Sequence, residues 1–312
     1  MKFYTSVLPY HGKLLVRGVK ADGNPCSYRV NYDPSLFIPV QKESKYKTLD
    51  GRNLDRVKFG SIVEAKKWIQ EYQGVTNFEY FGNTRYQYPY IADTFPDKIN
   101  WDIKQIKILT IDIECESENG FPDPSVAAQP LISITVRDNI TKKILVFGMG
   151  NFVNDRPDVI WRQCSTERDM IEKFAKFWTA HKPDVITGWN VKFFDIPYLM
   201  NRFKNLMGED YISRFSPWGI VNEGTAISLG YARQEKYFDL LGIATLDYLD
   251  LYRKHTFVRR ESYKLDYIGK VEVGETKNEN PYDTFKEFYQ NDYQRFVEYN
   301  IQDVELVDKL ED

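Results

Sequence analysis

Apolar residues run together or alternate with polar ones in several short stretches of this 312-residue chain, and such stretches predict β-strands. The alternation within 3–19 predicts a hairpin that turns at Tyr10-His11-Gly12. Apolar stretches at 107–114, 131–136 and 143–147 follow one another along the chain, and a turn at Asp138-Asn139 joins the last two, which favours an antiparallel meander. A further strand is expected at 184–189, and an extended pair around Leu229-Gly230 is expected within 219–242.

Helices are predicted where apolar residues recur at helical spacing behind a capping residue. Ser61 and Glu64 form the pattern of a capping box for a helix that runs to Tyr72. Thr166 is expected to cap a second helix, which Pro183 would end. Other helices are predicted at 196–206, 262–269 and 291–310. The aromatic-rich segment 78–90 is instead expected to form a strand pair that buries its rings.

The order of these elements predicts two domains. Residues 1–100 are expected to form a small mixed α+β domain, and residues 94–101 read as a linker. Residues 101–312 are expected to form an α/β (α+β) domain in which helices flank a mixed sheet. The segment 41–58 is rich in Lys and Arg, so it is either a solvated loop or a surface that contacts phosphates.

Composition limits the classes of function. The formal net charge is −3, so any binding of nucleic acid must be local rather than driven by a basic field over the whole chain. Three cysteines without metal-site spacing indicate reduced thiols of an intracellular protein. The sequence shows no signal-peptide profile and no apolar run of membrane-spanning length, so a cytoplasmic protein without a membrane partner is expected.

The candidate chemistry begins with Asp112 and Glu114, which lie two positions apart on an otherwise apolar strand. Residues i and i+2 of a strand point to the same face, so the two carboxylates are expected side by side. Burying such charges without a partner is unfavourable, and a divalent cation with oxygen ligands is the natural partner. The alternative is that the strand simply turns into solvent at this point.

Later parts of the chain contain three more residues that could belong to the same site as Asp112 and Glu114. Asp195 lies between a predicted strand and a predicted helix, where ligands gather in α/β sheets, although it could instead cap that helix. Tyr299 and Asp303 lie four residues apart on the last predicted helix and therefore share a face. Tyr299 could instead be a core aromatic residue, and Asp303 could be a solvent-facing charge.

Together, these residues resemble the three exonuclease motifs of family-B DNA polymerases. The motifs are Asp112-x-Glu114, Asn190-x-x-x-Phe194-Asp195 and Tyr299-x-x-x-Asp303, in this order. The resemblance is to the tyrosine subtype of the DEDD exonucleases, since Glu298 stands where a histidine-type enzyme carries histidine. Segments similar to the polymerases of T-even-like bacteriophages extend over nearly the whole chain, at 43–47, 121–124, 187–190, 214–217 and 246–252.

The resemblance implies a ribonuclease-H-like fold for 101–312 and the N-terminal domain of a polymerase for 1–100. It implies that two Mg²⁺ or Mn²⁺ ions bind to Asp112, Glu114, Asp195 and Asp303. Tyr299 would then orient the attacking water or the scissile phosphate. The activity implied is proofreading, the removal of nucleotides from a single-stranded or frayed DNA 3′ end. Phe121, Asn190 and Phe194 would contact the DNA.

The family's Tyr-Gly-Asp-Thr-Asp signature is absent from this sequence, so the palm, fingers and thumb are not part of it. These portions belong either to a separate chain of a split polymerase or to a part removed by truncation. Two further hypotheses stay open. The first is that residues 1–100 bind RNA or single-stranded DNA. The second is that the chain is a scaffold, which acts only with its partner polymerase subunit.

Overall fold

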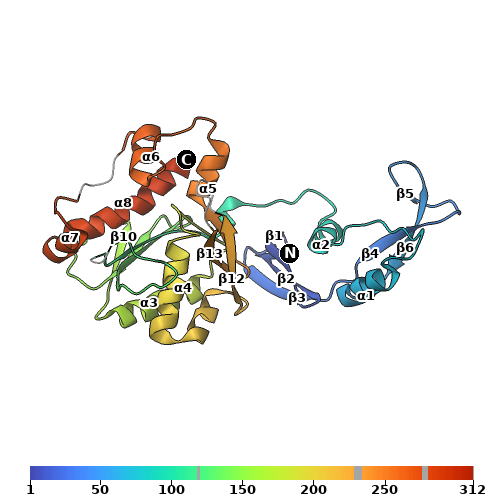
Figure 1. Ribbon diagram of the computed structural model, residues 1–312, viewed down its shortest axis with the longest axis horizontal. Coiled ribbons are helices and arrows are strands. Elements are labelled where there is room, and N and C mark those ends of the chain that lie inside the picture. The colour runs from blue at the N-terminus through green and yellow to red at the C-terminus, as the bar shows by residue number, and fades with distance from the viewer. Residues whose placement is uncertain (118–119, 228–233, 276–279, 312) are drawn as a thin grey trace. The chain divides into compact units, whose positions relative to one another are not determined.

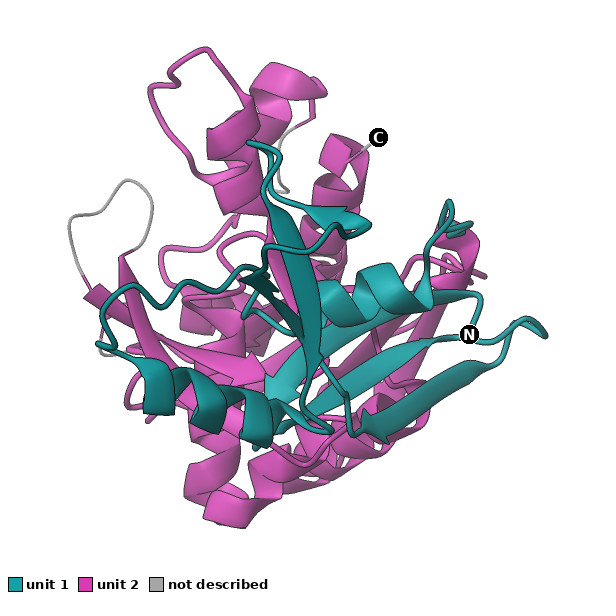
Figure 2. Cartoon of the chain, turned by 90° about the vertical axis from the view of Figure 1, so that its right-hand side faces the viewer, with its two compact units in different colours: residues 1–102 teal, residues 103–312 magenta. Residues whose placement is uncertain are grey.

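The computed structural model of the protein describes residues 1–117, 120–227, 234–275 and 280–311 (Figure 1). Its contacts divide the chain into two compact units, Met1–Asp102 and Ile103–Asp312, which Figure 2 shows in different colours. Among the described residues, no helix is both long enough and apolar enough to cross a membrane.

Unit 1 contains two small antiparallel sheets and two helices. The predicted hairpin is confirmed, and its turn residues His11 and Gly12 both adopt positive φ angles, 44° and 75°. Ser61 caps the first helix, because its side chain accepts a hydrogen bond from the Glu64 backbone N–H at 3.2 Å. The elements are β1 (Phe3–Tyr10), β2 (Lys13–Val19), β3 (Pro25–Val30), β4 (Ser35–Pro39), β5 (Tyr46–Lys47), β6 (Asn53–Lys58), α1 (Ile62–Tyr72) and α2 (Gln87–Thr94).

The expected strand pair at 78–90 is wrong. In this segment Phe81 makes one isolated bridge to Phe37, and the chain then enters α2. The aromatic ring of Phe78 packs in another way: it is half-buried and stacks on Tyr72 of α1 with ring centroids 4.4 Å apart, and it also meets Trp68. Packing against a helix therefore replaces the cross-strand pairing that the aromatic content suggested.

Unit 2 is built on a six-stranded mixed sheet with the strand order β10-β9-β8-β7-β11-β14. The predicted antiparallel meander of β7, β8 and β9 is confirmed. β11 pairs in parallel with β7 and with β14, and β10 pairs in parallel with β9. The strands are β7 (Ile108–Cys115), β8 (Leu131–Asp138), β9 (Ile144–Gly148), β10 (Val159–Gln163), β11 (Val185–Gly188) and β14 (Ala244–Asp247).

Helices cover both faces of this sheet, as expected for a ribonuclease-H-like fold. α3 (Glu167–His181) and α4 (Asp195–Met207) pack on one face, and α8 (Tyr293–Glu311) packs on the other, against β7, β8 and β9 (Figure 1). The other elements are η1 (Ile103–Gln105), η2 (Glu209–Phe215), β12 (Val221–Ile227), β13 (Gln234–Leu240), α5 (Tyr248–His255), α6 (Leu265–Glu272) and α7 (Phe285–Asn291). The predicted pair within 219–242 is confirmed as β12 and β13, but Leu229-Gly230 lies outside the described residues.

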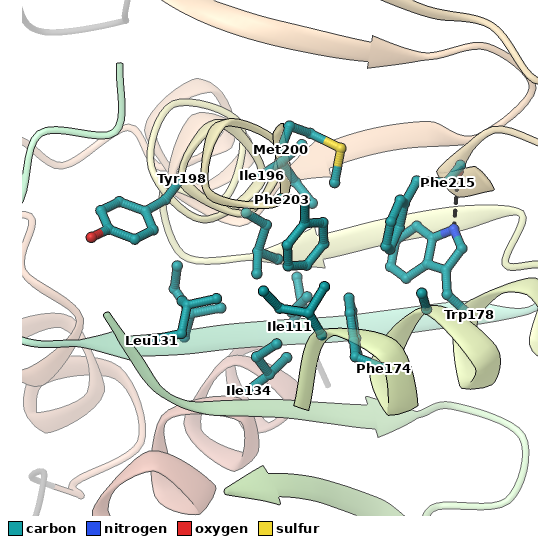
Figure 3. Packing of buried hydrophobic residues seen from close by; sticks show 14 of the residues in the cluster. Ile111, Leu131, Ile134, Phe174, Trp178, Ile196, Tyr198, Met200, Phe203 and Phe215 are labelled. Carbon is teal, nitrogen blue, oxygen red and sulfur yellow. Dashed lines mark hydrogen bonds between the residues drawn. The ribbon is translucent and has the colours of Figure 1, made fainter. Parts of the chain in front are cut away.

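Successive side chains of β7 point alternately to the two faces of the sheet, each of which is covered by different helices. Ile111 and Ile113 belong to the apolar cluster between the sheet and the helices α3 and α4. Figure 3 shows Ile111 together with Phe174 and Phe203 in this cluster, where Trp178 also donates a 2.9 Å hydrogen bond from Nε1 to the carbonyl of Phe215. Since neighbouring strand residues point to opposite faces, Asp112 and Glu114 face the layer occupied by α8.

Candidate active site

Three carboxylates from two distant segments meet between β7 and α8. One ligand oxygen from each of Asp112, Glu114 and Asp303 lies within 4.8 Å of the others. Asp303 is 3% exposed, so the interpretation of this residue as a solvent-facing charge is wrong. Asp112 and Glu114 are half-buried, and because both point toward α8, the alternative that the strand merely turns into solvent is wrong as well.

The chemistry of this donor set fits a hard divalent cation. Carboxylate oxygens are the ligands that Mg²⁺ and Mn²⁺ prefer, and three of them this close repel one another unless positive charge balances them. The neighbouring Cys115 does not compete as a ligand. Its side chain belongs to the opposite face of the sheet, and burial raises the pKa of its thiol to about 12.

Asp195 lies beside this cluster but outside the three-residue group. It is the first residue of α4, is 3% exposed, and its Oδ1 accepts a 3.1 Å hydrogen bond from the backbone N–H of Ile113. The carboxyl therefore abuts β7 between the two acidic positions. The interpretation of Asp195 as a helix cap is wrong, because Phe194 occupies the N-cap position and α4 has no side-chain cap.

The pKa of Asp195 is raised to about 7. Burial is the main cause, and the charges of Asp247 and Asp303 add to it, while the hydrogen bond from Ile113 acts in the opposite direction. A cation bound nearby would favour the ionised carboxylate. Positive charge beside Asp195 would therefore offset the effects of burial and of the neighbouring acids on its carboxyl group.

A buried amide holds Asp112 from the side of α8. Asn300 donates a 2.5 Å hydrogen bond from Nδ2 to Oδ2 of Asp112, and its Oδ1 accepts hydrogen bonds from the hydroxyls of Ser133 and Thr135. Asn300 is 0% exposed. The sequence analysis missed this residue, although its place three residues before Asp303 put it on the same helix face.

Tyr299 is half-buried on α8, one turn before Asp303. Its ring meets the edge of Phe288 with centroids 6.0 Å apart, so part of the side chain packs against the cluster under α7. The interpretation of Tyr299 as a core aromatic residue therefore holds for the ring. Its position one turn before Asp303 is also compatible with the implied role of its hydroxyl, which is to orient the attacking water or the scissile phosphate.

Asp247 fixes the loop that contains Asn190 and ends at Asp195. Its Oδ1 accepts from the backbone N–H groups of Asn190 and Leu249 at 3.1 and 3.0 Å, and its Oδ2 accepts from that of Lys192 at 2.9 Å. Asn190 has a φ of 65°, a left-handed conformation that these bonds help to hold. The sequence analysis missed Asp247, although an Asp between a strand and a helix is a common cap.

Two aromatic rings border a cavity beside Asp195. Phe121 is 83% exposed, and its ring lies 5.2 Å from that of Phe194, at an interplanar angle of 43°. They line a cavity of about 470 Å³ together with Asn190. The other lining residues come from the segment after Phe121, from the loop into α4, and from β13: Pro122, Asp123, Pro124, Ser125, Phe193, Pro197, Gln234, Glu235 and Lys236.

One face of α4 holds the segment that follows Phe121. Tyr198, Asn201, Arg202 and Asn205 recur at helical spacing, and each donates to backbone carbonyls between 124 and 129. Asn201 Nδ2 reaches Pro124 O at 2.8 Å, and Asn205 Nδ2 reaches Val126 O at 2.9 Å. The helix that begins with Asp195 thus also fixes the segment that carries Phe121, and the sequence analysis missed this role.

Comparisons with known proteins identify the family of this chain. The model of the exonuclease domain of DNA polymerase family B matches residues 70–268. The chain belongs to this family. It is 31% identical to the DNA-directed DNA polymerase of Enterobacteria phage T4 over 99% of this chain, and 30% identical to that of Escherichia phage RB69 over 97%. It is 29% identical to the DNA polymerase delta catalytic subunit of Caenorhabditis elegans over 67% of this chain.

The family-B exonuclease domain is a nuclease that hydrolyses DNA and uses divalent metal, so the predicted family, fold class and nuclease activity are confirmed. The chain spans only 37% of the T4 polymerase and 36% of the RB69 polymerase. The remaining length of those relatives has no counterpart in this sequence.

Proposed function

We propose that this chain is the proofreading 3′→5′ exonuclease portion of a phage replicative family-B DNA polymerase. Its substrate would be the 3′ end of single-stranded or frayed DNA. The observation that supports this most strongly is the approach of Asp112, Glu114 and Asp303 to within 4.8 Å, with Asp195 next to them. Residues 1–100 would be the polymerase's N-terminal domain and residues 101–312 its exonuclease domain, in keeping with the division into two units at 102/103.

The four carboxylates would hold two Mg²⁺ or Mn²⁺ ions. Asp112, Glu114 and Asp303 would hold one ion, and Asp112 and Asp195 would help to hold the second. When bound, the two ions would activate the attacking water and balance the charge that develops on the leaving 3′ oxygen.

Tyr299 would orient the attacking water or the scissile phosphate through its hydroxyl. A phenol is mostly protonated at neutral pH, which suits orientation better than proton abstraction. No histidine is needed as a base. His181 and His255 belong to other parts of unit 2, at the ends of α3 and α5, and His11 belongs to unit 1.

The cavity beside Asp195 would receive the terminal nucleotides. Bases stack on aromatic side chains whatever their sequence, and Phe121 and Phe194 present such rings at its border. Asn190 would contact the terminal nucleotide. A mispaired end costs less to unstack than a paired one, so a site of this kind selects frayed ends.

Shortening of a 5′-labelled single-stranded oligonucleotide in Mg²⁺ tests the proposal. We expect wild-type protein to produce a ladder of products shortened from the 3′ end, and Asp112→Ala with Glu114→Ala to fold normally but produce none. Glu298→Gln is the matched control, because Glu298 is an exposed acid on the same helix as Asp303. Full activity of the double variant would refute the assignment of the site.

A second proposal concerns unit 1, where residues 1–100 would bind RNA or single-stranded DNA. A cavity of about 450 Å³ in this unit is lined by His11, Lys13, Lys66 and Arg85, and no acidic side chain contributes to its lining. Cations and aromatic side chains together suit the backbone and bases of a single strand. A gel shift of the full chain with labelled RNA, repeated over a range of salt, should weaken with salt and with Lys13→Glu plus Lys66→Glu. Unchanged binding by this variant would refute the proposal.

We also propose that this chain acts with a polymerase portion that has palm, fingers and thumb, either as a separate chain or as a part removed by truncation, in the cytoplasm of a bacterial host. This rests on the phage polymerases, of which the chain matches about a third. If the chain were only a scaffold, it would cleave no oligonucleotide until that portion was added.

A further inference from the structure

We infer that Asn300 is a positioning residue, which orients the carboxylate of Asp112 for cation binding. The inference rests on the proposed function, since it assigns a role toward the proposed cation site. Asn300 does not belong to the carboxylate cluster itself. It contacts Asp112 through a 2.5 Å hydrogen bond, and its own amide is held by two hydroxyls on β8.

The hydrogen bonds fix which way the amide points. An ionised carboxylate can only accept hydrogen bonds, so the group of Asn300 that faces Asp112 must be the NH₂. The carbonyl oxygen then faces Ser133 and Thr135, and both hydroxyls must donate to it. A flipped amide would place two acceptors against each other, so this network has a single favourable arrangement.

The register of the sheet makes the network compact. Thr135 lies directly opposite Asp112 in the antiparallel ladder, and Ser133 lies directly opposite Glu114. Directly opposed residues point to the same face, so the hydroxyls and the carboxylates project together toward α8. Ser133, Thr135 and Asn300 are each 0% exposed, which keeps water from competing for these bonds.

This arrangement has a consequence for the cation site. One oxygen of Asp112 is held by Asn300, so the plane of the carboxylate and the direction of its second oxygen are set before any ion arrives. Hydrogen-bond partners that orient a metal ligand typically change metal affinity by about 10- to 100-fold when they are removed. A buried amide that served only to join α8 to β8 would have no such effect.

Asn300→Leu removes the hydrogen bonds while keeping a similar volume. We expect its dissociation constant for Mn²⁺, measured by calorimetry without DNA, to rise about 10- to 100-fold. We expect kcat on a single-stranded oligonucleotide to fall at low Mn²⁺ and to recover at high Mn²⁺, with KM for the oligonucleotide unchanged. Recovery by excess metal separates a positioning role from general damage to the fold.

Asn139→Leu is the matched control. The side chain of Asn139 also bonds β7, accepting from Ile108 N at 2.8 Å and donating to Ile106 O at 3.0 Å, but at the opposite end of the strand. It should lower the thermal midpoint and leave the affinity for Mn²⁺ at the wild-type value.

If Asn300→Leu does not fold, Thr135→Val keeps Asn300 and all four acids and removes one hydroxyl of the network. It should weaken Mn²⁺ binding by severalfold. Wild-type affinity and kcat in a folded Asn300→Leu, or in Thr135→Val when Asn300→Leu does not fold, would overturn the inference. Failure of the wild-type protein to bind Mn²⁺ would instead overturn the proposed function.

Discussion

Removing the two asparagines that tie the segment after Phe121 to α4 should loosen Phe121 without touching the carboxylates. In Asn201→Ala with Asn205→Ala, the carbonyls of Pro124 and Val126 lose their donors, which lie at 2.8 and 2.9 Å. A hydrogen bond of this kind contributes about 0.5–1.5 kcal/mol. Asn205 is exposed and Asn201 half-buried, so water can reach the released carbonyls and the lower part of that range applies.

The two losses together therefore favour release of the segment by about 1–2 kcal/mol. If Phe121 stacks on the terminal bases only while the segment is held, this corresponds to a rise in KM for a single-stranded oligonucleotide of about 5- to 30-fold. We expect kcat to stay within about twofold of wild type, because the hydrogen bonds that this variant removes lead to Pro124 and Val126, whereas the carboxylate cluster is formed by Asp112, Glu114 and Asp303.

A 3′-terminal 2-aminopurine reports the stacking directly, since its fluorescence falls when it stacks on an aromatic ring. The double variant should quench it less than wild type does. Phe121→Ala should raise KM alone, and adding it to the double variant should raise KM little further, because the asparagines act through Phe121. Fully additive effects, or an unchanged KM in the double variant, would refute this explanation.

Three further substitutions test other parts of the structure. In Asp247→Asn, the new NH₂ group faces the Lys192 N–H, so two donors meet and the loop that leads to Asp195 should loosen. We expect kcat on a single-stranded oligonucleotide to fall about tenfold, and an unchanged kcat would contradict this. Arg202→Met leaves the carboxylate of Glu167, whose side chain is 15% exposed, without its bidentate partner, and urea unfolding should show a loss of about 3 kcal/mol, the lower end of the range for buried pairs; a loss below about 1 kcal/mol would be unexpected. Burial lowers the pKa of His181 in the folded chain below the ordinary histidine value of 6.5. As the pH falls below 6.5, His181 is therefore protonated in the unfolded chain before it is protonated in the folded chain. Unfolding free energy should thus decline between pH 7 and 5 more steeply in wild type than in His181→Gln, and equal slopes would exclude this cause.

The parts of the site that could be predicted depend on local periodicity. The two-residue spacing of Asp112 and Glu114 on an apolar strand places both on one face whatever the rest of the fold does. The four-residue spacing of Tyr299 and Asp303 does the same on a helix. The meander and the flanking helices followed from similar patterns, and the order of the three motifs supplied the family.

The parts that were missed depend on contacts between distant segments. Asn300 meets Asp112 across 188 positions, and its spacing from Asp303 gives its helix face but not this distant partner. The donors of α4 look like the polar face of an amphipathic helix, yet they bind carbonyls about 75 residues away. The prediction of a strand pair at 78–90 was wrong for a different reason. Its composition is typical of strands, but Phe78 packs against α1 instead.

Anomalous diffraction from crystals soaked in Mn²⁺ tests the central claim most directly. A peak is predicted between β7 and α8, about 2.0–2.6 Å from carboxylate oxygens of Asp112, Glu114 and Asp303, and it should disappear in Asp303→Asn crystals. Mn²⁺ bound only at other positions, or a peak that persists unchanged in Asp303→Asn, would contradict the account.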